Sequence, residues 1–481
     1  MSPSSVFCLG IGRRRTLIGK AIIGFDMRPY FAFKILLPLL LVFSSIEGRA
    51  GAGEPLATVE LGPLLGYVGP AEALIWIKAS GPASAGVIVG ESADLQEGRA
   101  VAGPDLKAES DYMGVTRVTE LRPAKRYFYK ATLDGKPAPG SPHSFVTAPS
   151  AGSRGHLRFA FISCIGGFED QLHQRWVKDS VMAAWRALAD VPVDFVLHLG
   201  DNVYAESKDV AVLRRMYYWH RGLRPYRRVM AVTPMLAIWD DWDYAGGTAF
   251  GDGDGTAVGK QQVLRTFKEL WANPSYGQPT DPGIYFKFSW GDVEFFMLDV
   301  RYHRSPNVSE DDGQKTMLGP TQLAWLKREL AGSKATLRFL VSGNQWTSSG
   351  TSDSWRSFTR ERNGLFDFIR DSGIEGVVLL SGDRHLTAGY QVQQRFIEIT
   401  SSPFATRNHG APSRPQEMFM LHDQGHFFVV LDADTRTKPP RLVVEVHRVS
   451  KGMVRRRPLK WKEINGKVRI PTCEFSFDCR N

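Results

Sequence analysis

Cysteine is scarce in this chain of 481 residues, and three of its four cysteines lie near the ends. Cys8 falls within the first fifty residues, whereas Cys473 and Cys479 stand close together near the C-terminus. In an oxidising compartment we expect Cys473 and Cys479 to form a disulfide. Cys164 is then left over, and an odd cysteine in such a compartment calls for an explanation. It is therefore the first candidate for a functional side chain.

The sequence also has no apolar run long enough to cross a membrane. The apolar stretch at 35–43 is far shorter than the roughly 20 residues that a spanning helix requires. Arg28 and Lys34 precede it and the small-residue stretch 48–53 follows it, which is the layout of a signal peptide. We therefore expect residues 1–50 to be a signal or targeting segment. We also expect export, periplasmic or secreted, without a stable transmembrane anchor.

The beginning of this segment allows two interpretations. Met27 by itself would begin a signal of ordinary length, in which case residues 1–26 precede the true start codon. Alternatively Met1 is the start, and Arg13-Arg14-Arg15 followed by Thr16-Leu17-Ile18 resembles a twin-arginine signal. Both start codons and both export routes, Sec and Tat, stay open.

Several common catalytic and binding signatures are missing. The sequence has no Gly-rich phosphate cradle with lysine, no Gly-x-Ser-x-Gly elbow and no zinc-finger spacing. The Gly-rich stretch 246–259 carries Asp252 and Asp254, but it lacks the glutamate that closes an EF-hand calcium loop. We expect that stretch to be a loop at the rim of a site.

Charge and composition favour an ordinary globular protein. Apolar residues make up 43% of the chain and charged residues 23%, which suits one large domain and a smaller one. The formal net charge of +10 suits anionic substrates in general but does not single out nucleic acid. The densest basic run, Arg455 to Arg457, is interpreted as a solvated face.

Residues 53–150 have the texture of a small β-sandwich. Short alternating runs at 73–77, 85–89 and 126–131 are separated by turns rich in Gly and Pro. Leu121, Pro123, Tyr127 and Tyr129 resemble the late-strand pattern of fibronectin type III-like modules. Residues 148–155, rich in Ser, Gly and Pro, are the expected linker.

From residue 156 to about 450 the pattern predicts a layered α/β domain. Helical periodicity occurs at 176–188 and at 320–330, and we expect the remainder, 451–481, to be a basic C-terminal tail. Buried strands are predicted at 157–162, 195–199, 236–239, 295–298, 337–341, 377–380, 396–399, 427–431 and 441–446.

A polar cluster follows strand after strand in this domain. Because ligands gather where the strands of an α/β sheet end, six such clusters in order indicate a site. Aspartates brought together without cations would repel one another and take up protons, whereas metal ions remove that cost. With cysteine and histidine added, the residue types predict a metal site. The clusters are Ser163-Cys164, Gly200-Asp201-Asn202, Asp240-Asp241, Asp299 with Arg301, Gly343-Asn344-Gln345, and Gly382-Asp383-Arg384-His385.

The order of these clusters resembles a known family. The segments FISC, HLGDNVY, WDDWD, MLDVRYHR and LLSGDRHL are similar to successive signatures of the PhoD-like alkaline phosphatases, within the calcineurin-like metallophosphoesterase superfamily. The resemblance spans about 158–446. The spacing of Asp201 and Tyr204 also resembles purple acid phosphatases. The resemblance implies a four-layer αββα sandwich preceded by a small all-β domain.

The resemblance also implies a dinuclear metal site. Asp201 would bridge two ions, and Cys164, Tyr204 and His385 would complete the first site, a set that suits Fe(3+). The second site would take Asp241 and Asp383 together with Asp201, an oxygen-rich set suited to Ca(2+), with Mg(2+), Mn(2+) or Zn(2+) as possibilities. Asn202 would be a further contact, and Asp240 is an alternative to Asp241.

The implied activity is hydrolysis of phosphate esters. A metal-activated hydroxide at the site of Asp201 and Asp241 would attack the phosphorus atom of the substrate. Arg301 or Arg384 would neutralise charge on the phosphoryl oxygens. Members of the family usually carry a histidine where this chain has Trp242, and an indole cannot act as the proton donor. The clearest consequence is that esters with good leaving groups are hydrolysed readily, whereas alkyl esters are hydrolysed slowly.

Three candidates remain to replace that acid: Asp243, His220 and His303. Gln345 likewise stands where related enzymes place a histidine ligand. His198, inside an apolar strand, is expected to be a core residue. Tyr217, Tyr218, Trp219 and Trp271 form either an aromatic wall at a substrate site or ordinary core packing, of which we favour the core.

Three functions remain open from the sequence. The substrate is either a small phosphomonoester or a phosphodiester of a lipid or polymer. Because Trp242 replaces the family's histidine, the third alternative is a catalytically weakened phosphate- or lipid-binding protein. The oligomeric state is not indicated.

Overall fold

The computed structural model describes residues 56–471 except 206, 208, 245, 248, 249, 252–256, 348, 349, 410–414 and 416. Leu56–Asn481 forms one compact unit, separate from Met1–Pro55. The expected signal segment 1–50, Cys8 and the expected Cys473–Cys479 disulfide lie outside the described residues, as do Asp252 and Asp254. Within the described part, no helix is both long enough and apolar enough to cross a bilayer.

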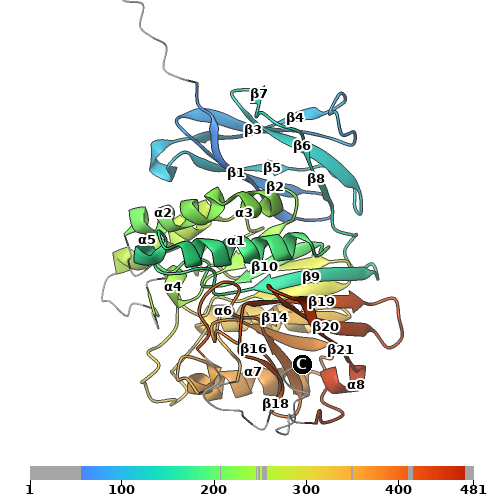
Figure 1. The fold of residues 1–481 in the computed structure, drawn as a ribbon. Coiled ribbons are helices and arrows are strands. Elements are labelled where there is room, and N and C mark those ends of the chain that lie inside the picture. The colour runs from blue at the N-terminus through green and yellow to red at the C-terminus, as the bar shows by residue number, and fades with distance from the viewer. Residues whose placement is uncertain are drawn as a thin grey trace, which may run out of the picture. The chain divides into compact units, whose positions relative to one another are not determined.

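Two antiparallel sheets form the N-terminal module (Figure 1). Alternating residues such as Val87 and Val89 point into a core shared with Leu65, Tyr129 and Phe145. The likeness to fibronectin type III modules stays a prediction. One sheet has the order β1 (Val59–Val68), β2 (Ala73–Ala79), β5 (Met113–Val118); the other has β4 (Arg99–Leu106), β3 (Ala83–Gly90), β6 (Arg126–Leu133), β7 (Lys136–Pro137), with β8 (His143–Val146) paired to β6.

Two larger sheets follow the module. The first begins with parallel strands and ends with antiparallel ones, in the order β11 (Met235–Ile238), β10 (Phe195–Leu199), β9 (His156–Ile162), β19 (Phe427–Asp434), β20 (Arg441–Arg448), β21 (Gly452–Leu459). The second has the order β12 (Phe286–Trp290), β13 (Val293–Met297), β14 (Leu337–Val341), β15 (Val377–Ser381), β17 (Phe396–Thr400), β16 (Thr387–Val392), β18 (Met418–His422).

The two sheets pack face to face with helices on their outer faces (Figure 1). Between them, the Phe159 ring lies 5.0 Å from Phe295 and 5.1 Å from Phe339, centroid to centroid. On the outer face of the first sheet lie α1 (Arg175–Ala189), α2 (Val210–Gly222), α3 (Arg224–Met230) and α5 (Ala257–Leu270); α6 (Pro320–Gly332) and α7 (Thr359–Asp371) cover the second. Short helices α4 (Asp241–Tyr244) and α8 (Trp461–Ile464) and the 3-10 turns η1 (Ala108–Ser110), η2 (Glu169–Gln171) and η3 (Trp355–Phe358) complete the chain.

The N-terminal module is bound to the helices of the first sheet by specific contacts. Trp76 donates its indole N–H to the Glu269 carbonyl oxygen at 2.8 Å, and the buried guanidinium of Arg221 lies 4.3 Å from the centre of the Trp76 ring. The Tyr129 hydroxyl donates to the Ala231 carbonyl oxygen at 2.7 Å. A side chain at Gly66 would come within 2.3 Å of Ala272, so only glycine permits this approach.

The prediction of a basic C-terminal tail from residue 451 is wrong for the first part of that segment. Residues 452–459 form β21, which pairs with β20 at the edge of the first sheet. Arg456 and Arg457 of the basic run contact Glu445 and Glu463 respectively. Charged side chains on an edge strand discourage pairing with another chain, which accounts for their presence there.

Candidate metal centre

The candidate metal centre lies at the carboxyl ends of β9, β10, β11 and β15. Cys164, Asp201, Asp241 and the Asp383–His385 segment each follow one of these strands within a few residues. Gly200 is required at this edge, because a side chain there would come within 2.4 Å of the Asp240 side chain. The prediction that the strand ends converge is therefore confirmed for these clusters.

Four of the predicted ligands have left-handed backbone conformations. The φ angles are 59° at Cys164, 49° at Asp201, 68° at Asp383 and 50° at His385. Residues other than glycine adopt this region uncommonly, and such strain clusters at functional sites. The backbone thus turns sharply at each strand end, and the ligands stand at the turns.

The four residues predicted for the first metal site come together. Ligand atoms of Cys164, Asp201 and His385 all lie within 4.8 Å of one another. The Tyr204 hydroxyl lies 2.9 Å from His385 Nε2 and 3.3 Å from Asp201 Oδ2. All four side chains are buried, so sulfur, phenol, carboxyl and imidazole groups share one small volume.

A second group of carboxylates adjoins the first. Oxygens of Asp201, Asp240 and Asp241 lie within 4.8 Å of one another. Asp240 is held by the Arg301 guanidinium, with Nε to Oδ1 at 2.6 Å, whereas Asp241 Oδ1 accepts the Trp242 backbone N–H at 3.0 Å. This arrangement favours Asp241 over Asp240 as the ligand, because the Arg301 charge already neutralises Asp240.

The electrostatics of the cluster oppose the charged form of each group. Burial, reinforced by neighbouring acidic groups, raises the pKa of Asp201 well above its usual value and that of Tyr204 likewise. Burial also raises the pKa of Cys164 to about 11 and that of Asp383 to about 7, and lowers the pKa of His385 to about 3. Protein groups alone therefore do not stabilise a cluster of anions here, whereas cations would.

Two buried oxygens in the cluster lack a hydrogen-bond partner among the described residues: Asp201 Oδ1 and Asp383 Oδ2. Buried polar atoms are almost always paired, so such orphans need an explanation. Together with the thiol, phenol and imidazole, they form a donor set that fits metal ions, including hard and borderline ones.

Ser402, a residue that the sequence interpretation missed, supports this cluster. Its hydroxyl donates to Cys164 Sγ at 3.0 Å and accepts the His385 backbone N–H at 3.0 Å. Ser402 follows β17 as the other clusters follow their strands, so the same rule applied to that strand would have found it.

Asn202 is not brought to the ligand cluster, contrary to expectation. Its amide oxygen contacts His198 Nδ1 at 3.0 Å, and its amide nitrogen donates to the Ile238 carbonyl oxygen at 3.0 Å and to Asp243 at 3.1 Å. Asp243 also accepts backbone N–H groups of Asn202, Val203 and Asp240. Asn202 and Asp243 therefore hold the loops after β10 and β11 together, and His198 is the expected core residue.

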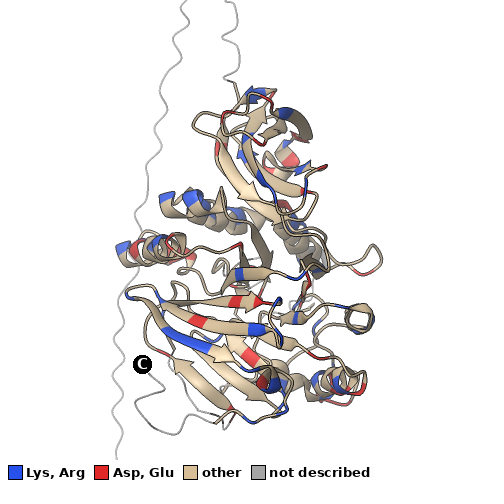
Figure 2. Ribbon diagram, turned by 90° about the vertical axis from the view of Figure 1, so that its right-hand side faces the viewer, with Lys and Arg blue, Asp and Glu red and all other residues tan. Residues whose placement is uncertain are grey.

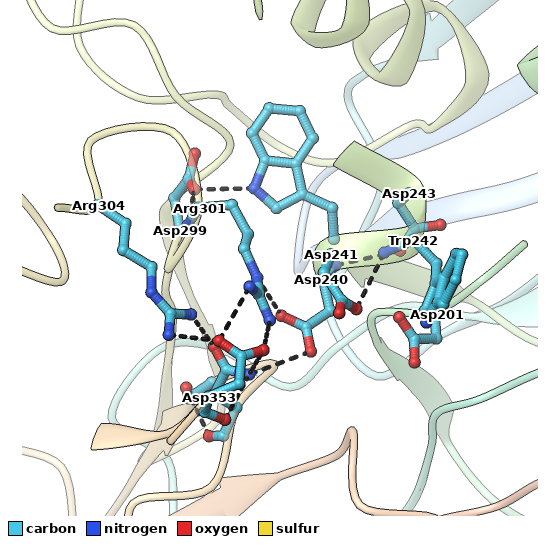
Figure 3. A network of polar contacts seen from close by, with 12 residues as sticks. Asp201, Asp240, Asp241, Trp242, Asp243, Asp299, Arg301, Arg304 and Asp353 are labelled. Carbon is cyan, nitrogen blue, oxygen red and sulfur yellow. Dashed lines mark hydrogen bonds and ion pairs between the residues drawn. The ribbon is translucent and has the colours of Figure 1, made fainter. Parts of the chain in front are cut away.

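Arg301 belongs to a buried ion-pair network beside the site (Figure 3). Besides Asp240, its guanidinium binds Asp353 at 2.9 Å, and Asp353 also binds Arg304. Burial alone would raise the pKa of Asp353, but the two guanidinium groups hold that pKa well below its usual value. Two carboxylates thus bind Arg301, whereas Arg384, the other arginine expected at a phosphoryl group, is half-exposed.

Trp242 stands beside the cluster in an aromatic group. Its ring lies 4.8 Å from Phe168 and 5.5 Å from Tyr204, centroid to centroid, and both Trp242 and Phe168 are half-buried. An apolar surface therefore lies at the position where the family's histidine was expected.

The three candidates for a replacement acid differ in their surroundings. Burial raises the pKa of Asp243 to about 7, although its oxygens accept the backbone N–H groups described above. His220 is buried, and desolvation lowers its pKa to about 3. His303 Nε2 contacts the Pro282 carbonyl oxygen at 2.8 Å.

Two further expectations concern residues away from the ligands. Gln345 stands where related enzymes place a histidine ligand. Its side-chain amide N–H groups donate to Thr400 Oγ1 at 3.0 Å and to the Tyr390 hydroxyl at 3.2 Å. Tyr217 and Trp271 are buried and lie 5.4 and 5.0 Å from the Arg221 guanidinium, as core packing requires.

Comparison with known proteins agrees with this geometry. The family described as PhoD-like phosphatase matches residues 159–419, and a domain of unknown function, DUF7800, matches residues 56–150. Alkaline phosphatase D of Bacillus subtilis (strain 168) is 23% identical over 331 residues, which cover 59% of this chain and 55% of that protein. The chain thus spans about half the length of this curated relative.

Solved structures show the fold. The structure of PhoD superposes with a TM-score of 0.67 at 17% identity and covers 84% of this chain and 92% of its own. A purple acid phosphatase, PPD1 from yellow lupin (Lupinus luteus) seeds, gives a TM-score of 0.61 at 14% identity, with 86% and 77% covered. Both likenesses indicate an α/β metallophosphoesterase-like fold with several sheets.

Proposed function

Because this chain belongs to the PhoD-like phosphatase family, we propose that it is an exported hydrolase of phosphate esters that works at a dinuclear metal site. The convergence of Cys164, Asp201, Tyr204 and His385 in one buried cluster carries the proposal. Export rests on the signal-like layout of residues 1–50.

The residues divide into two sets of ligands. Cys164, Tyr204 and His385 with Asp201 would hold the first ion, and thiolate with phenolate suits Fe(3+). Asp241 and Asp383 with Asp201 would hold the second, for which oxygen donors suit Ca(2+), or alternatively Mg(2+), Mn(2+) or Zn(2+). When bound, such ions polarise a phosphoryl oxygen and make water a better nucleophile at neutral pH.

Other side chains set the substrate preference. Arg384, next to Asp383, would neutralise charge that develops on the phosphoryl oxygens. Trp242 and Phe168 line the cluster with an apolar surface and supply no acidic proton. A leaving group that departs as a stable anion, such as a phenolate, needs no proton, so aryl esters are the favoured class.

Elemental analysis and a visible absorption spectrum of the purified protein test the metal assignment. A thiolate- or phenolate-bound ferric ion colours the protein, so we expect iron and a visible absorption band. An active but colourless and iron-free protein would overturn the first-site assignment. Rates on nitrophenyl phosphate and on bis-nitrophenyl phosphate distinguish a monoesterase from a diesterase.

Trp242 favours one alternative, a catalytically weakened phosphate- or lipid-binding protein. On that alternative, the ligand cluster fills with metal but the protein turns over neither nitrophenyl substrate. Full metal content with no hydrolysis of either compound therefore selects the binding protein, whereas hydrolysis of one of them selects the enzyme.

A further inference from the structure

A basic cleft lies where the N-terminal module meets α3. Its volume is about 570 Å³, and it is lined by residues of β1, by β6, by the loop between β7 and β8 with the first residue of β8, and by residues between 222 and 231. The hydrogen bond from the Tyr129 hydroxyl to the Ala231 carbonyl oxygen joins its two sides. Apart from its charged or titratable members, the lining consists of Gly, Ala, Pro, Ser and Val, whose small side chains leave the space open.

Every charge in the lining of this cleft is positive. Lys130, Arg224, Arg227 and Arg228 line it together with His143, and no Asp or Glu is among the described residues that do so. Burial, together with the Lys130 charge, lowers the pKa of His143, as expected in a positive potential. Basic and acidic residues are marked along the ribbon in Figure 2.

The three arginines of α3 are exposed and have no carboxylate partner within the part of the chain that the structure describes. The neighbouring helix α2 shows the contrast: Arg214 binds Glu269 at 2.6 Å, and Arg215 binds Glu169. Neighbouring guanidinium groups without counter-charges repel one another, and a bound anion removes that repulsion. Guanidinium groups also match phosphate by bidentate hydrogen bonding.

The cleft is separate from the metal centre. Ala231, at one side of the cleft, lies just before the amino end of β11, whereas the metal ligands follow the carboxyl ends of β9, β10 and β11. The two sites therefore lie at opposite ends of the strands of the first sheet. An anion in the cleft is not the ester that reacts, so a molecule that uses both sites must be long and carry several charges.

We propose that this cleft is an anchoring site for an extended polyanion that carries phosphate groups, distinct from the metal centre. The choice of phosphate over other anions rests on the proposed phosphoesterase function. The positive charge of the cleft lining is independent of that function. A polymer held at the cleft keeps the protein close to many ester bonds, and so raises their effective concentration at the metal centre.

Binding of long-chain inorganic polyphosphate to the whole protein tests the anchoring site. Isothermal titration compares the native protein with R224Q/R227Q/R228Q and with the control R356Q/R360Q, which removes two exposed arginines of η3 and α7. Because exposed charge pairs contribute modestly, we expect about a tenfold weaker affinity in the first variant and an unchanged one in the control. A second variant, S141E, puts an acidic group into the same lining and is expected to weaken binding as well.

Hydrolysis of nitrophenyl phosphate is measured on the same preparations. We expect all four proteins to agree within twofold, which shows that the variants are folded. Polyphosphate binding that is absent, or equal in all four proteins, overturns the anchoring site even if hydrolysis is normal. Hydrolysis that is absent in all four while binding depends on the arginines overturns the proposed enzyme and leaves the anchoring site in place.

Discussion

Cys164 is buried, stands at a left-handed turn and accepts a hydrogen bond from Ser402, all of which fix the sulfur against Asp201. We predict that Cys164→Ser loses iron and visible absorption and that its activity falls at least about 100-fold, because a neutral hydroxyl is a poor substitute for thiolate. Elemental analysis measures the iron, a visible spectrum measures the absorption, and nitrophenyl phosphate kinetics measure the activity.

Ser402→Ala provides the graded comparison for that variant. It keeps the thiol and removes the hydroxyl that donates to Cys164 Sγ and accepts the His385 backbone N–H. We therefore expect metal affinity to fall about 10- to 100-fold, with the colour retained at saturating metal. Retention of iron and colour by Cys164→Ser would show that the sulfur is not a ligand.

Trp242→His is predicted to change leaving-group preference. An imidazole at this position can donate a proton, so rates on alkyl phosphate esters should rise at least about tenfold while aryl esters change little. Trp242→Phe keeps an aromatic ring beside Phe168 without a donor, and its alkyl rates should not rise. A Trp242→His protein with full metal content and unchanged alkyl rates would contradict the proton-donor argument.

At this scale the sequence predicted which side chains come together better than it predicted the residues that support them. Cys164, Asp201 and His385 were predictable because each follows an apolar strand, and the strand ends meet. Asn202 follows Asp201 directly, yet its amide is used by His198 and Asp243, partners that only the folded chain brings near. The ion pair of Arg301 with Asp353 was not predictable for the same reason, since that carboxylate comes from a distant loop.

Among the elements, the loops after β11, β13 and β14 are joined by the buried network of Asp240, Arg301, Asp353 and Arg304 (Figure 3). We predict that Arg301→Met lowers the free energy of unfolding by about 3–5 kcal/mol, because it removes the guanidinium that pairs with buried Asp240 and leaves Asp353 with Arg304 alone. Urea denaturation measures this loss.

Arg356→Met is the matched control for that prediction. Arg356 is exposed, so its replacement should change the free energy of unfolding by no more than about 0.5 kcal/mol. Equal stabilities of Arg301→Met and Arg356→Met would mean that the network does not join the loops.

The sequence predicted many of the apolar strands but missed β16 and β18, although both are buried throughout. It also missed elements whose surfaces carry charged residues. Strands such as β10, β14 and β15 are apolar throughout, so their runs were recognisable. In β21, three consecutive arginines suggested a tail, although an edge strand tolerates such charges. Helix α7 was missed because charged residues interrupt its apolar positions, which the second sheet nevertheless buries.

At the scale of the whole molecule, the N-terminal module and the layered domain share contacts through Trp76, Arg221 and Tyr129. We therefore predict one cooperative thermal transition for residues 56–481 in scanning calorimetry. Trp76→Ala should lower the midpoint of that single transition rather than split it. Two separated transitions in the native protein would show that the module folds independently.

Buried histidines are expected to make the molecule sensitive to acid. Burial lowers the pKa of both His198 and His220 to about 3, well below the value of about 6.5 in an unfolded chain. A depressed pKa contributes stability at neutral pH, because the unfolded state takes up the proton first. That contribution is lost as pH falls from about 6.5 towards 3.

The predicted slope is roughly 1.4 kcal/mol of unfolding free energy per pH unit for each such histidine between pH 6 and 4. His220→Gln should reduce that slope by one histidine's share, measured by urea denaturation at several pH values. An unchanged slope would mean that His220 takes up its proton in the folded protein.

The left-handed turns at Asp201 and Asp383 have a consequence for the history of such proteins. Asparagine and glycine occupy this backbone region more readily than most residues. A single change from Asp to Asn at either position therefore discards a ligand charge without disturbing the chain path. The shortest mutational route away from catalysis leaves an intact scaffold, so inactive descendants would persist as folded proteins open to new uses rather than disappear through misfolding.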